Sequence, residues 1–273
     1  MSYFEHNDLS FYYTETGHGT PFIFQHGLGG SVDQIIKIYS PPSGVRLITF
    51  DFRGHGKTQM SRKEELNFKT FADDVLAFMS HLLVDKAIIG GISMGAGVAL
   101  NFALRYPDRT LALILSRPAW LDRPMEKQNK EIYSFIAKLL RENGHEKGRQ
   151  IFIASDLYTQ LSIVSPTTAQ SFLGHFNYER ASETAVKYEL LPEDAPIDSR
   201  SEWKKITAPM LILANKSDPV HPFEYGLEYA SAIGHADFKE ITSKSINEEQ
   251  HNKDVKKYID MFINKILDRS HSP

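Results

Sequence analysis

The sequence predicts a doubly wound α/β fold, in which helices cover both faces of a mostly parallel β-sheet. The first observation is a series of short apolar runs without alternation, at residues 22–24, 47–50, 87–89, 111–115 and 210–213. Such runs are typical of strands that are buried on both faces. The second observation is helical periodicity between and after these runs, at residues 71–83, 98–105 and 255–267.

Two further segments complete the predicted sheet. Residues 9–16 alternate and are rich in aromatic side chains, so we expect an edge strand that ends at Gly17 and Gly19. Residues 238–241 predict the last strand, which a polar loop connects to the C-terminal helix. That helix places its apolar residues on one face, as a helix packed against a sheet does.

Between residues 118 and 200 the alternation of strands and helices stops. Helices are expected at residues 125–143, from Ser165 to Phe176, and at residues 179–191. The segment is long for a loop and large enough to fold back over the rest of the chain. We therefore expect a core of residues 1–117 and 201–273, with residues 118–200 inserted as a helical lid. Its many aromatic side chains are expected to form a small core, and some of them to line a substrate pocket.

The composition excludes several classes of function. The net charge is −3 and no basic patch is present, which argues against nucleic-acid binding. The absence of cysteine excludes disulfides, thiolate metal sites and cysteine nucleophiles. The first residues show no signal peptide, and the apolar run at residues 87–104 contains four glycines and does not fit a membrane span. We expect a soluble, cytoplasmic protein.

The central motif is Gly91-Ile92-Ser93-Met94-Gly95, which lies between a predicted strand and a predicted helix. A serine hydroxyl is a poor nucleophile, so it must stand clear of the backbone near a base. A sharp strand-to-helix turn provides this position and needs glycine on both sides of the serine. The alternative is a glycine-rich turn with an incidental serine, since Gly-x-Ser-x-Gly also occurs by chance. The strand before the motif and the helix after it favour the nucleophile.

Polar segments follow the predicted strands, at the edge where doubly wound sheets bind ligands. They are residues 26–31, 51–56 and 215–219, together with Ser93. Asp218 is the expected acid that orients the base, and Asp122 is the alternative. His251 is the expected base, because a base should follow the acid in the chain and should lie beyond the last strand.

Other histidines fit the role of the base less well. His221 is too close to Asp218 in sequence, and His235 precedes the last strand. His26, Arg53 and His55 are expected to brace loops. The expected oxyanion donors are the backbone N–H groups of Leu28 and Met94.

Motifs for nucleotide and metal binding fail on inspection. Gly56-Lys57-Thr58 resembles the end of a phosphate-binding loop, but that loop needs glycine at the position of Asp51. Leu100 occupies the place of the third glycine of a dinucleotide motif. No spacing typical of metal ligands occurs. We therefore expect no cofactor and no metal.

Taken together, the segments 26–31, 51–56 and 91–95, the Asp218 turn and His251 resemble the α/β-hydrolase superfamily, in its small, lidded branch of esterases, lactonases and carbon–carbon bond hydrolases. The resemblance covers residues 1–117 and 201–273. It implies that Ser93 is the nucleophile, His251 the general base and Asp218 the acid, with Leu28 and Met94 as oxyanion donors. One departure is Gln250, because family members commonly have glycine immediately before the catalytic histidine.

The sequence thus predicts a serine hydrolase that cleaves a small, apolar carboxylic ester, thioester or lactone through an acyl-enzyme. Serine at position 93 argues against the dehalogenases and epoxide hydrolases of the superfamily, which use aspartate there. A receptor or regulator with slow turnover and a cofactor-free perhydrolase remain alternatives, because both fit the same three residues. A homodimer is also left open.

Overall fold

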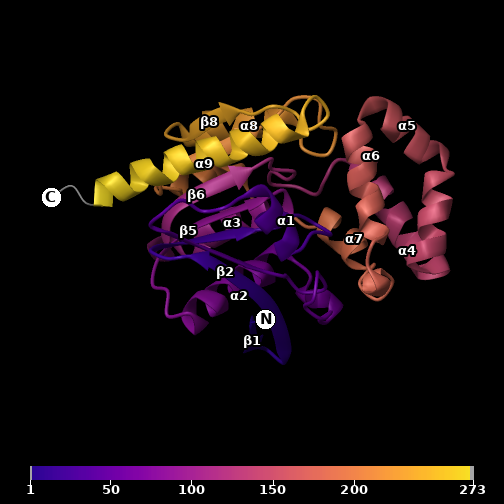
Figure 1. The fold of residues 1–273 in the computed structure, drawn as a ribbon, viewed down its shortest axis with the longest axis horizontal. Helices are drawn as coiled ribbons and strands as arrows, with labels where there is room; N and C mark the ends of the chain where they lie inside the picture. The colour runs from indigo at the N-terminus through magenta and orange to yellow at the C-terminus, as the bar shows by residue number, and fades with distance from the viewer. Residues whose placement is uncertain (1, 271–273) are drawn as a thin grey trace.

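The computed structural model describes residues 2–270 of the chain, and in it one eight-stranded sheet forms the centre (Figure 1). The strand order is β1-β2-β4-β3-β5-β6-β7-β8. Pairing is antiparallel between β1 and β2 and between β2 and β4, and parallel elsewhere. The strands are β1 Ser2–His6, β2 Leu9–Gly17, β3 Thr20–Gln25, β4 Val45–Phe50, β5 Ala87–Ile92, β6 Thr110–Ser116, β7 Met210–Ala214 and β8 Asp237–Glu240.

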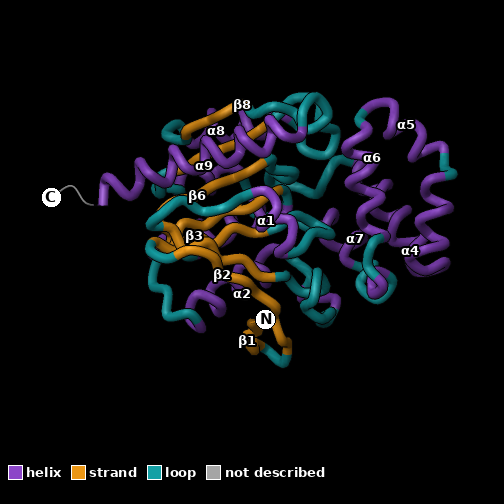
Figure 2. Tube along the Cα trace, in the orientation of Figure 1, coloured by secondary structure: helices purple, strands orange, loops and turns teal. Residues whose placement is uncertain are grey.

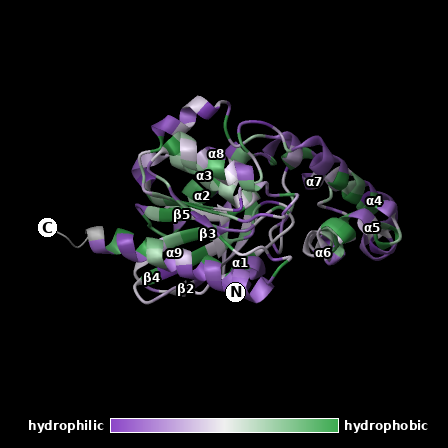
Figure 3. Cartoon of the chain, turned by 90° about the horizontal axis from the view of Figure 1, so that it is seen from above, coloured by the Kyte–Doolittle hydropathy of each residue, from purple (hydrophilic) through white to green (hydrophobic). Residues whose placement is uncertain are grey.

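Helices cover the two faces of the sheet, which confirms the predicted fold class. Two of them, α1 (Val32–Ile38) and α9 (Glu248–Ser270), pack on one face. The opposite face carries α2 (Phe68–His81), α3 (Met94–Arg105) and α8 (Phe223–Ile233). Figure 3 shows the two layers on either side of the strands. The apolar strand runs are buried because successive side chains of a strand point into the two layers in turn.

The prediction that residues 9–16 form an edge strand is wrong. Strand β2 lies between β1 and β4, because residues 2–6 form a hairpin with it. Asn7 and Asp8 make the two-residue turn with φ values of 49° and 61°. Asparagine and aspartate tolerate this left-handed backbone better than most residues, and such a turn matches the twist of paired strands.

The chain between β6 and β7 contains helices and no strand within the described residues, and it lies beyond one end of the sheet (Figure 2). Its helices are α4 Lys127–Ile153, α5 Asp156–Val164, α6 Pro166–Leu173 and α7 Lys187–Leu190. The regular helix of α4 is interrupted at Gly144, where φ is 75°. Ser165 caps α6 as expected, since its side chain accepts a hydrogen bond from the N–H of Thr168.

The continuous helix predicted for residues 179–191 is wrong, because the segment forms short 3₁₀ turns and the four-residue α7. Lys187 is buried here, and its Nζ donates to the carbonyl oxygen of Gly54 at 2.6 Å and to the hydroxyl of Thr184 at 3.0 Å. The Tyr178 hydroxyl donates to the Gly29 carbonyl at 3.3 Å. These contacts with loops at the carboxyl ends of β3 and β4 outweigh the helical preference of the segment, because tertiary contacts routinely override local propensity.

No helix among residues 2–270 has both the length and the apolar character that crossing a bilayer requires.

Candidate active site

Ser93 occupies the turn between β5 and α3. Its φ and ψ are 57° and −112°, a conformation that side-chain-bearing residues rarely adopt. The turn is held by a hydrogen bond from the Ser93 N–H to the Ser116 carbonyl, at 3.0 Å. A Cβ on Gly91 would overlap the Gly95 carbonyl, and one on Gly95 would lie 2.5 Å from the Gln25 carbonyl oxygen. The two glycines are therefore required by the close approach of strand and helix.

The Ser93 side chain lines a cavity of about 510 Å³ between the sheet and the helical segment. The serine hydroxyl forms no hydrogen bond with any of the described residues. From the core, the cavity is lined by Gly27, Leu28, Arg117, Asp218 and His221, among others. From the helical segment, Tyr133, Phe172 and His175 contribute, together with a mostly polar row within residues 165–171 that comprises Ser165, Pro166, Thr167, Thr168, Gln170 and Ser171. The cavity thus lies under the segment for which a lid was predicted.

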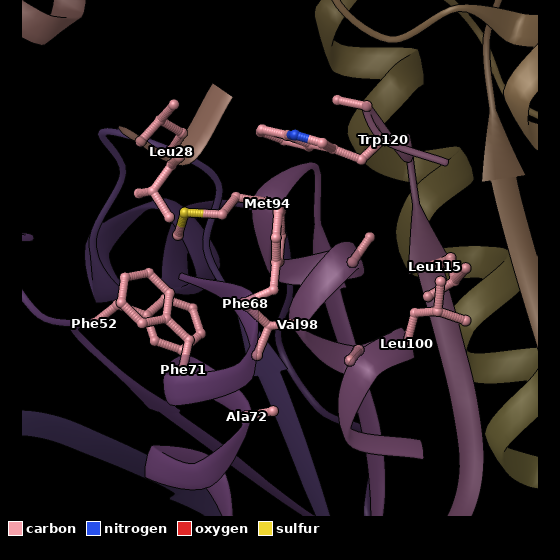
Figure 4. Packing of buried hydrophobic residues seen from close by; sticks show 14 of the residues in the cluster. Leu28, Phe52, Phe68, Phe71, Ala72, Met94, Val98, Leu100, Leu115 and Trp120 are labelled. Atoms are coloured by element: carbon pink, nitrogen blue, oxygen red, sulfur yellow. The ribbon is translucent and has the colours of Figure 1, made fainter. Parts of the chain in front are cut away.

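The two expected oxyanion donors belong to Leu28, which follows Gly27, and to Met94, which follows the serine. The Gly27 backbone passes so near that a Cβ there would lie 3.3 Å from the Ser93 Cβ. Gly27 is held by Gln34, whose side-chain oxygen accepts from its N–H at 2.8 Å. The Met94 N–H belongs to the first turn of α3, where backbone donors lack partners within the helix. The Met94 side chain extends toward Leu28 above a cluster of buried rings (Figure 4). The role of both donors stays a prediction.

Asp218 lies in the turn after β7, with its side chain largely buried. One carboxylate oxygen accepts from the N–H groups of Val220 and His221, at 3.1 and 3.2 Å. The other accepts from His221 Nδ1 at 2.8 Å and faces Arg117 Nη1 at 3.5 Å. Burial by itself raises the pKa of Asp218, but the charge and hydrogen bond of His221 and the charge of Arg117 lower it well below its usual value. The carboxylate is therefore ionised.

The histidine that contacts Asp218 is His221. It also lines the cavity with Ser93. Because Nδ1 donates to the carboxylate, Nε2 is left as the proton acceptor. The sequence predicts that a spacing of three residues is too short for this role. The turn from Asp218 to His221 folds back on itself, so this short spacing brings the ring onto the carboxylate.

The expected base, His251, lies outside the contact between Asp218 and His221. The C-terminal helix α9 begins at Glu248, so His251 belongs to its first turn. Its ring is buried, is not among the groups that line the cavity, and donates from Nδ1 to the Thr242 carbonyl at 2.7 Å. Burial, followed by the charge of Arg117, lowers the pKa of His251 to about 3. Within residues 2–270, Asp218 and His251 share no hydrogen bond. The assignment of His251 as the base stays a prediction.

The comparisons with known proteins identify the family. A family model described as the alpha/beta hydrolase fold matches residues 20–247. The chain belongs to the α/β-hydrolase family. It is 29% identical over 237 residues to an AB hydrolase superfamily protein of Bacillus subtilis, with 82% of this chain and 84% of that protein covered. It is 28% identical over 243 residues to a 2-hydroxy-6-oxo-6-phenylhexa-2,4-dienoate hydrolase of Comamonas testosteroni, with 84% and 82% covered.

Solved structures share the fold of this α/β-hydrolase. An enol-lactonase from Burkholderia xenovorans superposes with a TM-score of 0.71 at 20% identity, covering 98% of each chain. A thermophilic esterase from Thermogutta terrifontis gives a TM-score of 0.71 at 22% identity, covering 94% of each chain. At these identities the likeness concerns the fold.

Other residues considered for the site of this α/β-hydrolase have structural contacts. Asp122, the alternative acid, accepts from Arg200 Nε at 2.8 Å and is not part of the cavity lining. His26 donates from Nδ1 to the Gly27 carbonyl at 2.8 Å and accepts the Phe52 N–H at 3.2 Å. The Arg53 guanidinium donates to both carboxylate oxygens of the buried Asp74, at 2.6 and 2.7 Å. His26 and Arg53 therefore brace loops, as expected.

Three cations of the cavity were not among the expected site residues of this hydrolase. They are Lys37 at the end of α1, Arg117 directly after β6, and Lys244 in the loop after β8. The strand-end rule that selected Asp218 applies equally to Arg117, which follows the apolar run at residues 111–115. Nothing in the local pattern distinguishes Lys37 from other surface lysines.

Proposed function

We propose that this α/β-hydrolase is a serine hydrolase that forms an acyl-enzyme on Ser93. The observation that carries the proposal is a serine in a strained turn whose side chain lines one cavity together with the Asp218–His221 pair. Strain of this kind persists only where the surrounding structure imposes it, and it often accompanies function. The substrate is a small carboxylic ester, thioester or lactone.

In the first step, the Ser93 oxygen attacks the acyl carbon while a histidine nitrogen takes the hydroxyl proton. The carbonyl oxygen becomes an oxyanion, to which the N–H groups of Leu28 and Met94 are assigned as donors. The histidine then returns the proton to the leaving alkoxide or thiolate, and the bond to the leaving group breaks. In the second step, water loses a proton to the same histidine and attacks the acyl carbon. The histidine then returns this proton to the Ser93 oxygen as its bond to the acyl carbon breaks, which releases the acid and restores the serine.

Two histidines are candidates for the proton transfer. His221 is supported by its 2.8 Å contact with Asp218 and by its place in the cavity lining. His251 is supported by the chain order Ser-Asp-His. We favour His221, because Asp218 then fixes the ring tautomer and stabilises the protonated ring. His251 remains the alternative.

The residues from 118 to 200 act as a lid in this proposal. The hydroxyl of Tyr178 and the Nζ of Lys187 bond to carbonyls of core loops and hold the segment in place, and the docked segment shields Ser93 from bulk water. The similar proteins are named as a dienoate hydrolase, an enol-lactonase and an esterase. These names support the proposal that this protein hydrolyses a bond next to a carbonyl group.

A fluorophosphonate probe followed by peptide mass spectrometry tests the proposal. We expect one label per chain, on Ser93, and no label on the Ser93→Ala variant. The same variant should lose hydrolysis across a panel of chromogenic esters, thioesters and lactones. Full activity in the Ser93→Ala variant would show that the nucleophile is assigned to the wrong residue. Slow single-turnover kinetics with strong thermal stabilisation by a ligand would instead favour a receptor, and halogenation with peroxide and acetate would favour a perhydrolase.

A further inference from the structure

The cavity that contains Ser93 carries more positive than negative charge. Lys37, Arg117 and Lys244 line it, and the carboxylates that line it are Asp218 and Glu248. Asp218 is already engaged by His221, as described above. Glu248 approaches Lys244 only to 3.8 Å, and its side chain is exposed. Arg117 and Lys244 therefore have acidic neighbours only at 3.5 and 3.8 Å, and the cations of the lining outnumber its carboxylates by three to two.

Arg117 shows the shortage most clearly. Its side chain is 10% exposed, and its polar contact with a described residue is the 3.5 Å approach of Nη1 to Asp218. Its Nε–H is buried with no partner. A nearly buried guanidinium whose contact with a carboxylate is as long as 3.5 Å is costly to the folded protein, and an anion that binds it offsets this cost. The backbone of Arg117 also has a φ of 49°, so strain is imposed at this position too.

Lys244 belongs to the same group of charges. Its side chain is 26% exposed and lines the cavity beside Ser243. Burial, and then the charge of Arg117 and of Lys37, lower the pKa of Lys244 to about 8, against the opposing effect of Glu248. Arg117 and Lys37 thus both lie close enough to Lys244 to act on its charge, and a negative group among these side chains would relieve this repulsion.

We propose that Arg117, Lys244 and Lys37 bind a carboxylate on the substrate, next to Ser93. The inference rests on the proposed hydrolase function and deepens it: the acyl group that Ser93 attacks carries a second, free carboxylate, as in a monoester or a lactone of a dicarboxylic acid. A planar guanidinium suits a carboxylate because it can donate two parallel hydrogen bonds. The polar row at residues 165–171 faces the same cavity. This substrate differs from the apolar one that the sequence suggested.

Two matched esters test the subsite by kinetics. Mono-4-nitrophenyl glutarate carries the free carboxylate, and 4-nitrophenyl pentanoate has the same acyl length without it. After subtraction of spontaneous hydrolysis, we expect wild-type kcat/KM to favour the glutarate ester. In Lys244→Gln that preference should fall at least tenfold. The control is Lys253→Gln on α9, whose lysine pairs with Glu249 and does not line the cavity, and which should keep the wild-type preference.

Calorimetry with glutarate separates the subsite from the hydrolase function. Ser93→Ala cannot form an acyl-enzyme, yet it should bind glutarate, and adding Lys244→Gln should weaken that binding at least tenfold. This result would hold even if no ester were cleaved. Absence of saturable glutarate binding to Ser93→Ala, or an unchanged ester preference in Lys244→Gln, would overturn the inference. Tighter binding of inorganic phosphate than of glutarate would overturn its assignment to a carboxylate.

Discussion

The backbone strain at Ser93 can be released by one substitution. The conformation at φ 57° and ψ −112° is the mirror image of extended backbone, which glycine adopts as readily as the normal hand. Ser93→Gly should therefore remove strain that costs roughly 1–3 kcal/mol. The greater freedom of glycine in the unfolded chain opposes this by roughly 0.4–1 kcal/mol. No side-chain hydrogen bond is lost, since the serine hydroxyl has no partner among the described residues.

The expected net effect is a gain of roughly 0.5–2 kcal/mol in the free energy of unfolding, with complete loss of hydrolysis. For a chain of this size each kcal/mol raises Tm by roughly 2–4 °C. The control is Ser93→Ala, which also removes the hydroxyl but keeps the Cβ and hence the strain. Thermal and urea unfolding of the two variants measure the difference. If Ser93→Gly were no more stable than Ser93→Ala, the idea that strain is stored at the nucleophile would be refuted.

Two more predictions follow from close packing and from burial. Gly95→Ala should destabilise the protein by at least about 1–3 kcal/mol, because its Cβ would lie 2.5 Å from the Gln25 carbonyl oxygen. The control is Gly174→Ala, whose Cβ meets open space and which should be nearly neutral in urea unfolding. Burial, and then the charge of Lys187, lower the pKa of His175 to about 3 in the folded protein. Because the ordinary pKa of about 6.5 applies to the unfolded chain, that chain binds a proton at a higher pH than the folded protein does. The folded protein therefore loses stability as pH falls from about 6.5 toward 3. Between pH 7 and pH 4 the free energy of unfolding of His175→Phe should fall less than that of the wild type, by up to about 1.4 kcal/mol per pH unit. Equal losses in the two proteins would contradict the assignment of this pH dependence to His175.

The sheet could be predicted from sequence because burial on both faces leaves a direct signal. The apolar runs at residues 22–24, 47–50, 87–89 and 210–213 correspond to β3, β4, β5 and β7. The hairpin strand at residues 2–6 leaves a weaker signal in the sequence. Of its five residues only Phe4 is buried, so no run of apolar side chains marks the strand. The turn residues Asn7 and Asp8 indicate the hairpin, but a two-residue turn carries no periodicity.

The site was harder to predict than the fold, because side-chain direction in irregular turns depends on tertiary contacts. Ser93 was identifiable since a strand and a helix fix its turn. The contact of Asp218 with His221 depends on how one turn folds back, which chain order does not encode. Residues 179–191 were expected to be one helix for a similar reason: the burial of Lys187 against the Gly54 carbonyl is a contact between distant parts of the chain.

The measurement that tests the account most directly compares His221→Asn with His251→Asn in the acylation of Ser93. The burst of 4-nitrophenol from 4-nitrophenyl acetate reports this step by stopped flow. If His221, held by Asp218, takes the proton, His221→Asn should slow acylation by roughly 10²–10⁴-fold. His251→Asn should then stay within about tenfold of wild type, since that ring bonds to the Thr242 carbonyl instead of the carboxylate. The reverse pattern, with acylation lost in His251→Asn and kept in His221→Asn, would contradict the account.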